Sequence, residues 1–367
     1  MERRNERLVP FKAVHPGVTL RKELEAREIK QKDFAAMIGM QPTHLNAVIK
    51  GSRDVTLELA MKLEETLGIE YGFWMKLQAS YHYNVKAIAK RNEDEQKAIL
   101  EEQAMTSMVN MTMLYKRLEI SCIKPIERLS DVKFRMGNAY TESAIDSHEN
   151  GFFKHSEKCN IDERNMRTWI ILALMAARDV KLDVEYHEGN AAKAAYEIAR
   201  MANEGLLTKQ AVQECLNGYG IGYCYVEKLD KAPVDAFSTK KYEHPAIVVT
   251  YRYNDRDKLA FDIIHELCHL EKHAGDGCDD FIAYEGLYAD DPYEVEANEF
   301  ARDMLIPPAA WKAIMKVQPK SSYPAVVAKC IAEEAEKRGI SKSIAISRYK
   351  HDSNVYNIKS YRSAKIQ

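Results

Sequence analysis

The segment His265-Glu266-Leu267-Cys268-His269 has the residue types and the spacing that bind a metal ion. Residues four apart share one face of an α-helix, so the two imidazoles converge on one point. Glu266 is rotated by about 100° from His265 and stays free, which suits a carboxylate that takes a proton from water. The alternative is that both histidines are core residues satisfied by hydrogen bonds. The pattern predicts a hydrolytic metal site, with Zn²⁺ as the ion.

The residues around this motif predict a buried helix. Asp257 to Lys272 contains no Gly or Pro and repeats apolar residues at helical intervals. His273 continues the series, but on a continuous helix its Cα would lie about 12 Å from that of His265, too far for one tetrahedral ion. We therefore expect His273 to support the site from outside the ligand set or to lie at the surface.

A zinc site needs a third protein ligand, and a second helix downstream offers acidic candidates. Asp291 is a natural N-cap and Pro292 suits the first helical position. Glu294, Glu296 and Glu299 compete for the ligand role. Glu294 can point into the same interior as the first helix, whereas Glu296 projects from a different face toward solvent. Glu294 has an alternative role as a capping-box carboxylate that reaches back to the backbone of Asp291.

The N-terminal region has the pattern of a helix-turn-helix between Gln31 and Lys50. Gly39 can take the positive φ that a tight turn needs, and Pro42 can open the next helix. A preceding helix at Thr19 to Arg27 and a following one at Thr56 to Leu67 complete a small all-helical domain.

The exposed side of the second short helix offers polar side chains for contact with DNA. Asn and Gln side chains can read adenine edges, although such residues are also ordinary on protein surfaces. Residues 1 to 55 hold 11 Lys and Arg against 7 Asp and Glu, which is only a mild excess for phosphate contacts. The candidate DNA-binding residues are Gln31, Gln41, Thr43, His44, Asn46 and Lys50.

The C-terminal motifs carry a family resemblance. The apolar strand at 246 to 252, the helix with the two histidines, and the segment from Glu294 to Pro307 resemble the ImmA/IrrE family of metallopeptidases over roughly residues 190 to 310. The resemblance implies a zincin-like fold in which His265, His269 and Glu294 hold Zn²⁺ and Glu266 is catalytic.

The N-terminal motifs carry a second resemblance. His15-Pro-Gly-Val-Thr-Leu, the helix-turn-helix pattern and Tyr71-Gly-Phe-Trp resemble the HigA-type antitoxin branch of the Cro-like helix-turn-helix family, over about residues 10 to 84. This implies binding to operator DNA as a homodimer, with a toxin as a partner. Fusions of such a module to an ImmA/IrrE-type peptidase form a recognisable group, and the whole chain resembles one.

Composition favours a cytoplasmic protein. The chain of 367 residues is 46% hydrophobic and 29% charged, with a net charge of -2. No run of 18 apolar residues predicts a membrane span, and the charged start does not resemble a signal peptide. The dispersed cysteines contain no CxxC pair and predict reduced thiols rather than a cysteine metal site. They are Cys122, Cys159, Cys215, Cys224, Cys268, Cys278 and Cys330.

These patterns predict a mainly α fold with a small β-sheet (α+β), organised as three regions. A helix-turn-helix DNA-binding domain would occupy residues 1–84, and a helical connector or middle region would occupy 85–189, with a core helix around Trp169. An ImmA/IrrE-like metallopeptidase domain with a C-terminal helical cap would fill 190–367. We expect the basic tail from Tyr349 to be an ordinary surface terminus.

Two functions remain open at this stage. In the first, the chain is a DNA-binding transcriptional regulator with a zinc-dependent endopeptidase domain that cleaves a regulatory partner or itself. In the second, it is a non-catalytic antitoxin or repressor that binds operator DNA and a toxin or signal, with a structural or vestigial metal. Glu266 favours the first, because a structural zinc site has no need of that carboxylate.

Three further roles complete the catalytic hypothesis. The strand at 246 to 252 would align a substrate by offering a sheet edge. Asn298 would orient a metal ligand without touching the metal. A tyrosine would stabilise the oxyanion, and the candidates are Tyr253, Tyr284, Tyr288 and Tyr293.

Overall fold

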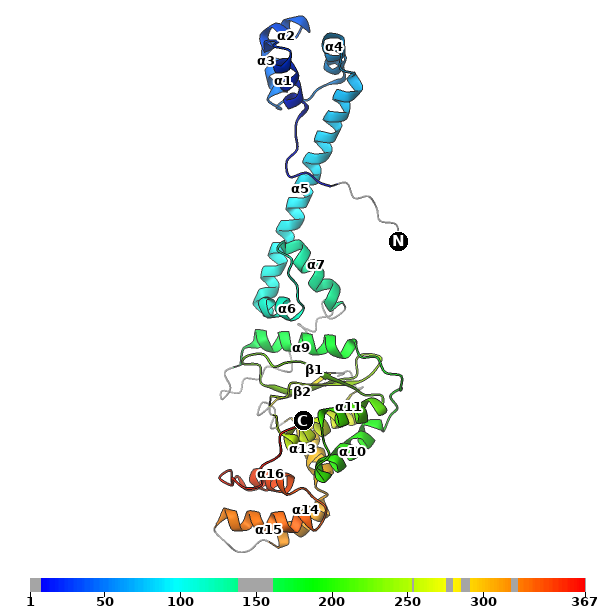
Figure 1. The fold of residues 1–367 in the computed structure, drawn as a ribbon, viewed down its shortest axis with the longest axis vertical. Coiled ribbons are helices and arrows are strands. Elements are labelled where there is room, and N and C mark those ends of the chain that lie inside the picture. Colours follow the sequence, from blue (N-terminus) through cyan, green and yellow to red (C-terminus); the bar gives the residue numbers. More distant parts are fainter. Residues whose placement is uncertain are drawn as a thin grey trace. The chain divides into compact units, whose positions relative to one another are not determined.

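The computed structural model describes residues 8–137, 161–252, 254–274, 280–284, 291–317 and 323–366 (Figure 1). These residues divide into two compact units. The first unit runs to Glu102 and includes Lys124–Glu127, and the second contains Gln103–Ile123 and the residues from Arg128 onward. Within the described part of the chain, no helix combines the length and apolar character that a membrane crossing requires.

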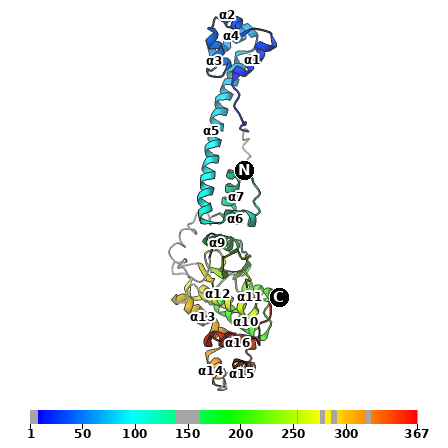
Figure 2. The same cartoon turned by 90° about the vertical axis from the view of Figure 1, so that its left-hand side faces the viewer.

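The first unit has one apolar core, built from four short helices and the first turns of a long fifth helix (Figure 2). Phe34, Leu45, Leu63 and Trp74 come from four different helices and are fully buried in it. The helices are α1 (Pro16–Ala26), α2 (Gln31–Met37), α3 (Pro42–Ile49), α4 (Leu57–Leu67) and α5 (Tyr71–Met108). The last residues of α5, from Gln103 onward, belong to the second unit.

The turn between α2 and α3 confirms the predicted helix-turn-helix geometry. Gly39 has a φ of +61°, in the left-handed region that favours glycine, and Pro42 is the first residue of α3. Helix α1 packs closely on α3, because a Cβ added to Gly17 would lie 2.0 Å from the carbonyl oxygen of Val48. A glycine at position 17 therefore lets the two backbones approach.

The second unit contains a four-stranded sheet with the order β1-β3-β2-β4. β1 pairs with β3 in parallel, and β2 is antiparallel to both β3 and β4. β3 therefore pairs on both sides, and the prediction that this strand offers a free edge to a substrate is wrong. Apolar content reports that a strand is buried but not where it stands in the sheet order. The strands are β1 (Gly222–Tyr225), β2 (Val234–Thr239), β3 (Ala246–Val249) and β4 (Asp280–Tyr284).

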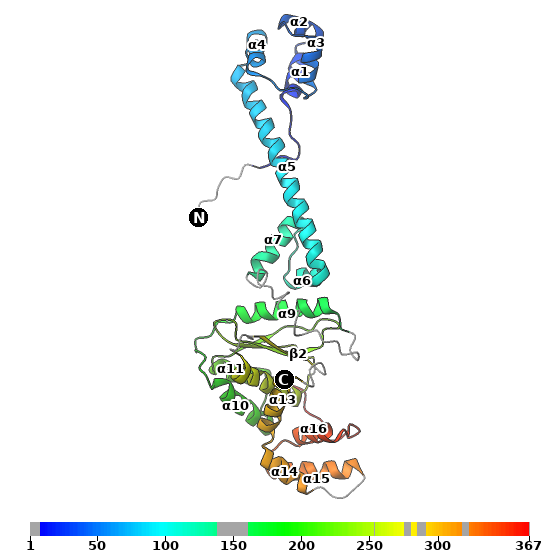
Figure 3. The same cartoon turned by 180° about the vertical axis from the view of Figure 1, so that it is seen from behind.

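Helices cover both faces of this sheet (Figure 3). On one face, Trp169 packs against Phe237, with ring centroids 6.4 Å apart, which confirms the predicted core helix. On the other face, Ala236, Ile247 and Val249 belong to a core shared with several helices. The covering helices are α9 (Glu163–Arg178) on the first face and α10 (Asn190–Glu204), α11 (Lys209–Gly218) and α12 (Arg256–Cys268) on the second. The mainly α fold with a small sheet is thus confirmed.

Among the described residues of the second unit, four further helices follow the sheet in the chain, and two precede it. Arg348 anchors the C-terminal end of α13 (Pro292–Leu305) by donating hydrogen bonds of 3.0 Å to the carbonyl oxygens of Arg302 and Ile306. The other helices are α14 (Pro308–Lys316), α15 (Pro324–Glu336) and α16 (Lys342–Ser353), with α6 (Met111–Arg117) and α7 (Pro125–Met136) earlier.

The C-terminal tail is part of the core, so the expectation of an ordinary surface terminus is wrong. Ile358 and Ile366 are each 5% exposed and belong to the core beneath the sheet. Arg256 donates its backbone N–H to the carbonyl of Ala364 at 3.0 Å, which attaches the tail to the first residue of α12. The prediction failed because it relied on the basic composition of the tail, in which only a few apolar residues carry the contacts with the core.

Candidate metal centre

Helix α12 carries His265 and ends at Cys268, one residue before His269. Asp255 caps its N-terminus by accepting hydrogen bonds from the backbone N–H groups of Asp257 and Lys258. The prediction of a continuous α-helix to Lys272 needs correction, because a π-helical turn, η1 (His269–His273), follows Cys268. Burial of Ile263, Ile264 and Leu267 fixes the rotation of α12 and turns His265, and His269 just after its end, into the interior.

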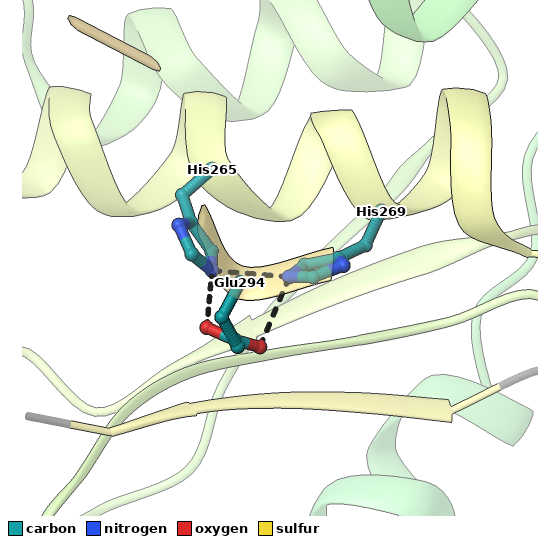
Figure 4. A group of neighbouring side chains, drawn as sticks. All are labelled: His265, His269 and Glu294. Carbon is teal, nitrogen blue, oxygen red and sulfur yellow. Dashed lines mark hydrogen bonds and ion pairs between the residues drawn. The ribbon is translucent and has the colours of Figure 1, made fainter. Parts of the chain in front are cut away.

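Three side chains from α12, η1 and α13 converge on one point (Figure 4). The Nε2 atoms of His265 and His269 lie 3.0 Å apart. Glu294 approaches both rings, with Oε2 at 3.2 Å from His265 Nε2 and Oε1 at 3.3 Å from His269 Nε2. His265 is 3% exposed and His269 is fully buried.

Helix α13 decides which of the three competing glutamates reaches the histidines. Asp291 caps this helix and accepts from the backbone N–H groups of Tyr293 and Glu294. The carboxylate of Glu294 points to the two imidazoles, so the alternative of a capping box with Asp291 does not hold. Glu296 is instead paired with Lys272 at 2.6 Å, and Glu299 is exposed on the same helix.

The donor set fits Zn²⁺. Bonds from zinc to imidazole nitrogen or carboxylate oxygen are about 2.0–2.2 Å long, so donors at tetrahedral corners lie about 3.3–3.5 Å apart. The observed separations of 3.0, 3.2 and 3.3 Å are close to these values. Burial alone would raise the pKa of Glu294, but hydrogen bonding to His265 and His269 holds that pKa at about 2. Two imidazoles and an ionised carboxylate leave one tetrahedral position for an exogenous ligand.

Glu266 lies beside this cluster and is not part of it. Its side chain is fully buried, and neither carboxylate oxygen makes a well-aligned hydrogen bond within the described part of the chain, although the Ser238 hydroxyl is close enough to interact with it. Burial raises the pKa of Glu266 to about 8, against the opposing effects of the neighbouring His265 and of the Ser238 hydroxyl. A buried carboxylate with so little hydrogen bonding is costly, and such groups are concentrated at functional sites.

Two family descriptions match the chain. A helix-turn-helix family matches residues 20–74, and the M78 peptidase family, described as an IrrE N-terminal-like domain, matches residues 223–348. The chain contains a helix-turn-helix domain and an IrrE-like domain. Both resemblances expected from the motifs are therefore confirmed, and the three converging side chains all belong to the IrrE-like domain.

Individual similar proteins cover only a short part of the chain. The virulence-associated protein I of Dichelobacter nodosus is 27% identical over 70 residues, which are 19% of this chain and 65% of that relative. An antidote protein of a plasmid maintenance system from Nostoc punctiforme is 27% identical, covers 23% of this chain and 93% of its own, and has a TM-score of 0.22. An addiction module antidote protein of the HigA family from Coxiella burnetii is 25% identical over 24% of this chain and 95% of its own, also with a TM-score of 0.22.

The structure describes only some of the residues that were expected to orient a metal ligand or to stabilise the oxyanion. Asn298 is half-buried on α13, one turn after Glu294, and makes no side-chain hydrogen bond with another described residue. Tyr293 lies against the ring of His273, with centroids 4.8 Å apart. Tyr253, Tyr288 and the side chain of Tyr284 lie outside the described residues.

In the helix-turn-helix domain, the candidate DNA-contacting side chains face solvent on α3 and at its two caps, with Gln31 at the start of α2. The apolar residues of α3, Leu45, Val48 and Ile49, are buried, which turns the polar residues between them outward. Every one of the six candidates is exposed: Gln31, Gln41, Thr43, His44, Asn46 and Lys50.

Proposed function

We propose that this chain is a DNA-binding transcriptional regulator whose IrrE-like domain is a zinc-dependent endopeptidase, cleaving a regulatory partner or the chain itself. The observation that carries the proposal is the placement of Glu266 next to His265 on α12. Glu266 is buried, makes no well-aligned hydrogen bond and is excluded from the ligand set. A purely structural metal site gives no reason to bury a carboxylate there.

His265, His269 and Glu294 would hold the zinc ion, each through the atom that faces the shared point. When bound, Zn²⁺ supplies Lewis acidity, which polarises a peptide carbonyl and makes water more acidic. The three ligands come from α12, from the turn η1 that continues it, and from α13, and both α12 and α13 are capped at their N-termini and packed on the core. Their positions are therefore set before any substrate binds, which removes an ordering cost from the reaction.

Glu266 would move the proton. With zinc bound beside it, the positive charge would favour the ionised form of Glu266. Its carboxylate would accept a proton from the water that attacks the carbonyl carbon, and would then donate this proton to the amine nitrogen as the peptide C–N bond breaks. The dry surroundings of Glu266 suit this role, because a buried carboxylate has no water shell to lose when a substrate covers the site.

The helix-turn-helix domain would place the chain on operator DNA. Its support is the family match at residues 20–74 together with the exposed polar surface of α3. Such a helix lies in the major groove in this class of domain, and a homodimer would present two copies to two half-sites.

Replacing Glu266 with Gln tests the catalytic part of the proposal. Purified wild type, Glu266→Gln and the matched surface variant Glu299→Gln are loaded with zinc and incubated with a lysate of the cells that naturally produce the chain. New protein N-termini are then mapped by mass spectrometry, including those of the chain itself. We expect cleavage by wild type and Glu299→Gln, and a loss of roughly 10²–10⁴-fold for Glu266→Gln with zinc and DNA binding retained.

The same fragments from Glu266→Gln, or no zinc-dependent fragments from wild type, would contradict the proposal. Either result would favour a non-catalytic antitoxin or repressor that binds operator DNA and a toxin or signal, with a structural or vestigial metal.

A further inference from the structure

His273 is a buried neighbour of the ligand His269. Its side chain is 7% exposed, and its Nδ1 atom lies 2.8 Å from Nδ1 of His269. Both residues belong to the π-helical turn η1, in which Ala274 donates its backbone N–H to the carbonyl of His269, five residues back. The two ring centroids lie 5.0 Å apart, and the ring planes are tilted by 58°.

The other nitrogen of His273 faces an acid on α13. Nε2 of His273 lies 3.3 Å from Oε2 of Glu296, and the second oxygen of Glu296 accepts from Lys272 Nζ at 2.6 Å. Two carboxylates of α13 therefore face the histidines. Glu294 contacts His265 and His269 directly, and Glu296 contacts His273, which in turn contacts His269.

The protons along this chain of groups can be assigned by elimination. A metal ligand must present an unprotonated nitrogen, and His269 faces the shared point with Nε2, so its proton is on Nδ1. That N–H donates to Nδ1 of His273, which must then be the unprotonated nitrogen of a neutral ring. The proton of His273 is consequently on Nε2 and donates to Glu296.

We propose that His273 and Glu296 form a hydrogen-bonded relay that holds His269 in its metal-binding tautomer and orientation. This inference rests on the zinc site of the proposed function and adds two positioning residues to it. His265 has no equivalent support, because its Nδ1 atom is buried without a hydrogen-bond partner among the described residues. His269 is therefore the pre-oriented ligand of the pair.

Zinc affinity provides the first test, measured by competition with a chromophoric chelator. Loss of a group that orients a ligand typically weakens metal binding by about 10–100-fold. We expect this loss for His273→Leu and for Glu296→Ala. Glu299→Ala removes the same charge from the exposed side of α13 and should leave affinity unchanged. Lys272→Ala should have little effect, because it removes a partner of Glu296 but leaves the contact with His273.

The second test reads the hydrogen bond itself, by NMR of the zinc-loaded chain with ¹⁵N-labelled histidine. Wild type and Glu299→Ala should show a slowly exchanging Nδ1 proton on His269, with a coupling across the hydrogen bond to Nδ1 of His273. His273→Leu should lose both signals, and Glu296→Ala should broaden them. A general loss of structure would instead alter the circular dichroism and the signals of remote residues.

Zinc affinities of His273→Leu and Glu296→Ala equal to that of Glu299→Ala would overturn the relay and leave the proposed peptidase intact. Absence of the Nδ1 proton signal in zinc-loaded wild type would overturn it as well. A different result would contradict the proposed function alone. In that case the zinc affinities and the NMR signals follow the expected pattern, but Glu266→Gln cleaves as wild type does. If wild type binds no zinc, both proposals fall.

Discussion

Oε2 of Glu294 on α13 lies 3.2 Å from Nε2 of His265 on α12, within a cluster that also contains His269. The two helices are separated in the chain by η1 and β4. Arg348 fixes the C-terminal end of α13 by donating hydrogen bonds to two backbone carbonyls. Helix packing thus brings a carboxylate to two imidazoles that share one helix face.

Zinc content should follow this cluster. We expect about one zinc per chain in wild type by elemental analysis, because three donors at tetrahedral spacing suffice for a site with one open position. His265→Ala and Glu294→Ala should lose the metal, since each leaves only two protein ligands. Glu299→Ala should retain it, and a metal-free wild type after zinc supply would refute the site.

DNA binding should depend on Lys50 at the end of α3. Lys50→Ala removes one phosphate contact, so the slope of log affinity against log salt should fall by about 1 for each DNA-bound copy. Lys76 is also exposed, on α5, and Lys76→Ala makes the same change in charge. Equal slopes for both variants in fluorescence anisotropy titrations with operator DNA would argue against α3 as the contact surface.

Two helical glycines should respond in opposite directions to alanine. Gly17→Ala would place a Cβ 2.0 Å from the Val48 carbonyl oxygen, and we expect it to destabilise the contact of α1 with α3 by roughly 1–3 kcal/mol. Gly72 in α5 has open space around its Cβ position, so Gly72→Ala should stabilise its helix by about 0.5–1 kcal/mol. Hydrogen exchange of peptides from α1, α3 and α5 measures both effects locally.

A buried ion cluster beside α12 should make stability depend on pH. Lys258 lies 2.5 Å from Asp262 and 3.2 Å from Asp235, and His265 also faces this region. Burial raises the pKa of Asp262 to about 6, with Lys258 and His265 opposing the rise and Asp235 adding to it. Because the folded pKa exceeds the unfolded value of 3.8, folding takes up a proton in this window, and stability falls as pH rises through it.

Asp262→Asn removes this dependence. Relative to wild type, the free energy of unfolding of the variant should increase from pH 4 to pH 6 by up to about 3 kcal/mol. Urea unfolding of the metal-free chain, followed by tryptophan fluorescence, gives the difference at each pH. A difference that stays flat across the window would show that Asp262 is not the group that titrates.

Local patterns in the sequence determined much of this protein. The four-residue spacing of His265 and His269 placed both rings on one helix face, and Gly39 with Pro42 marked a turn between two helices, because both features depend only on backbone geometry within a few residues. Apolar periodicity likewise predicted the buried sides of α3 and α12.

Only the tertiary structure decided the contacts that join distant segments. Glu294, Glu296 and Glu299 lie within two turns of one helix, and the packing of α13 against α12 selected Glu294 for the histidine pair. The π-helical turn at His269–His273, the central position of β3 and the buried C-terminal tail were not readable from the chain. Each depends on which partner a segment packs against, and that choice is set by the whole core rather than by neighbours in sequence.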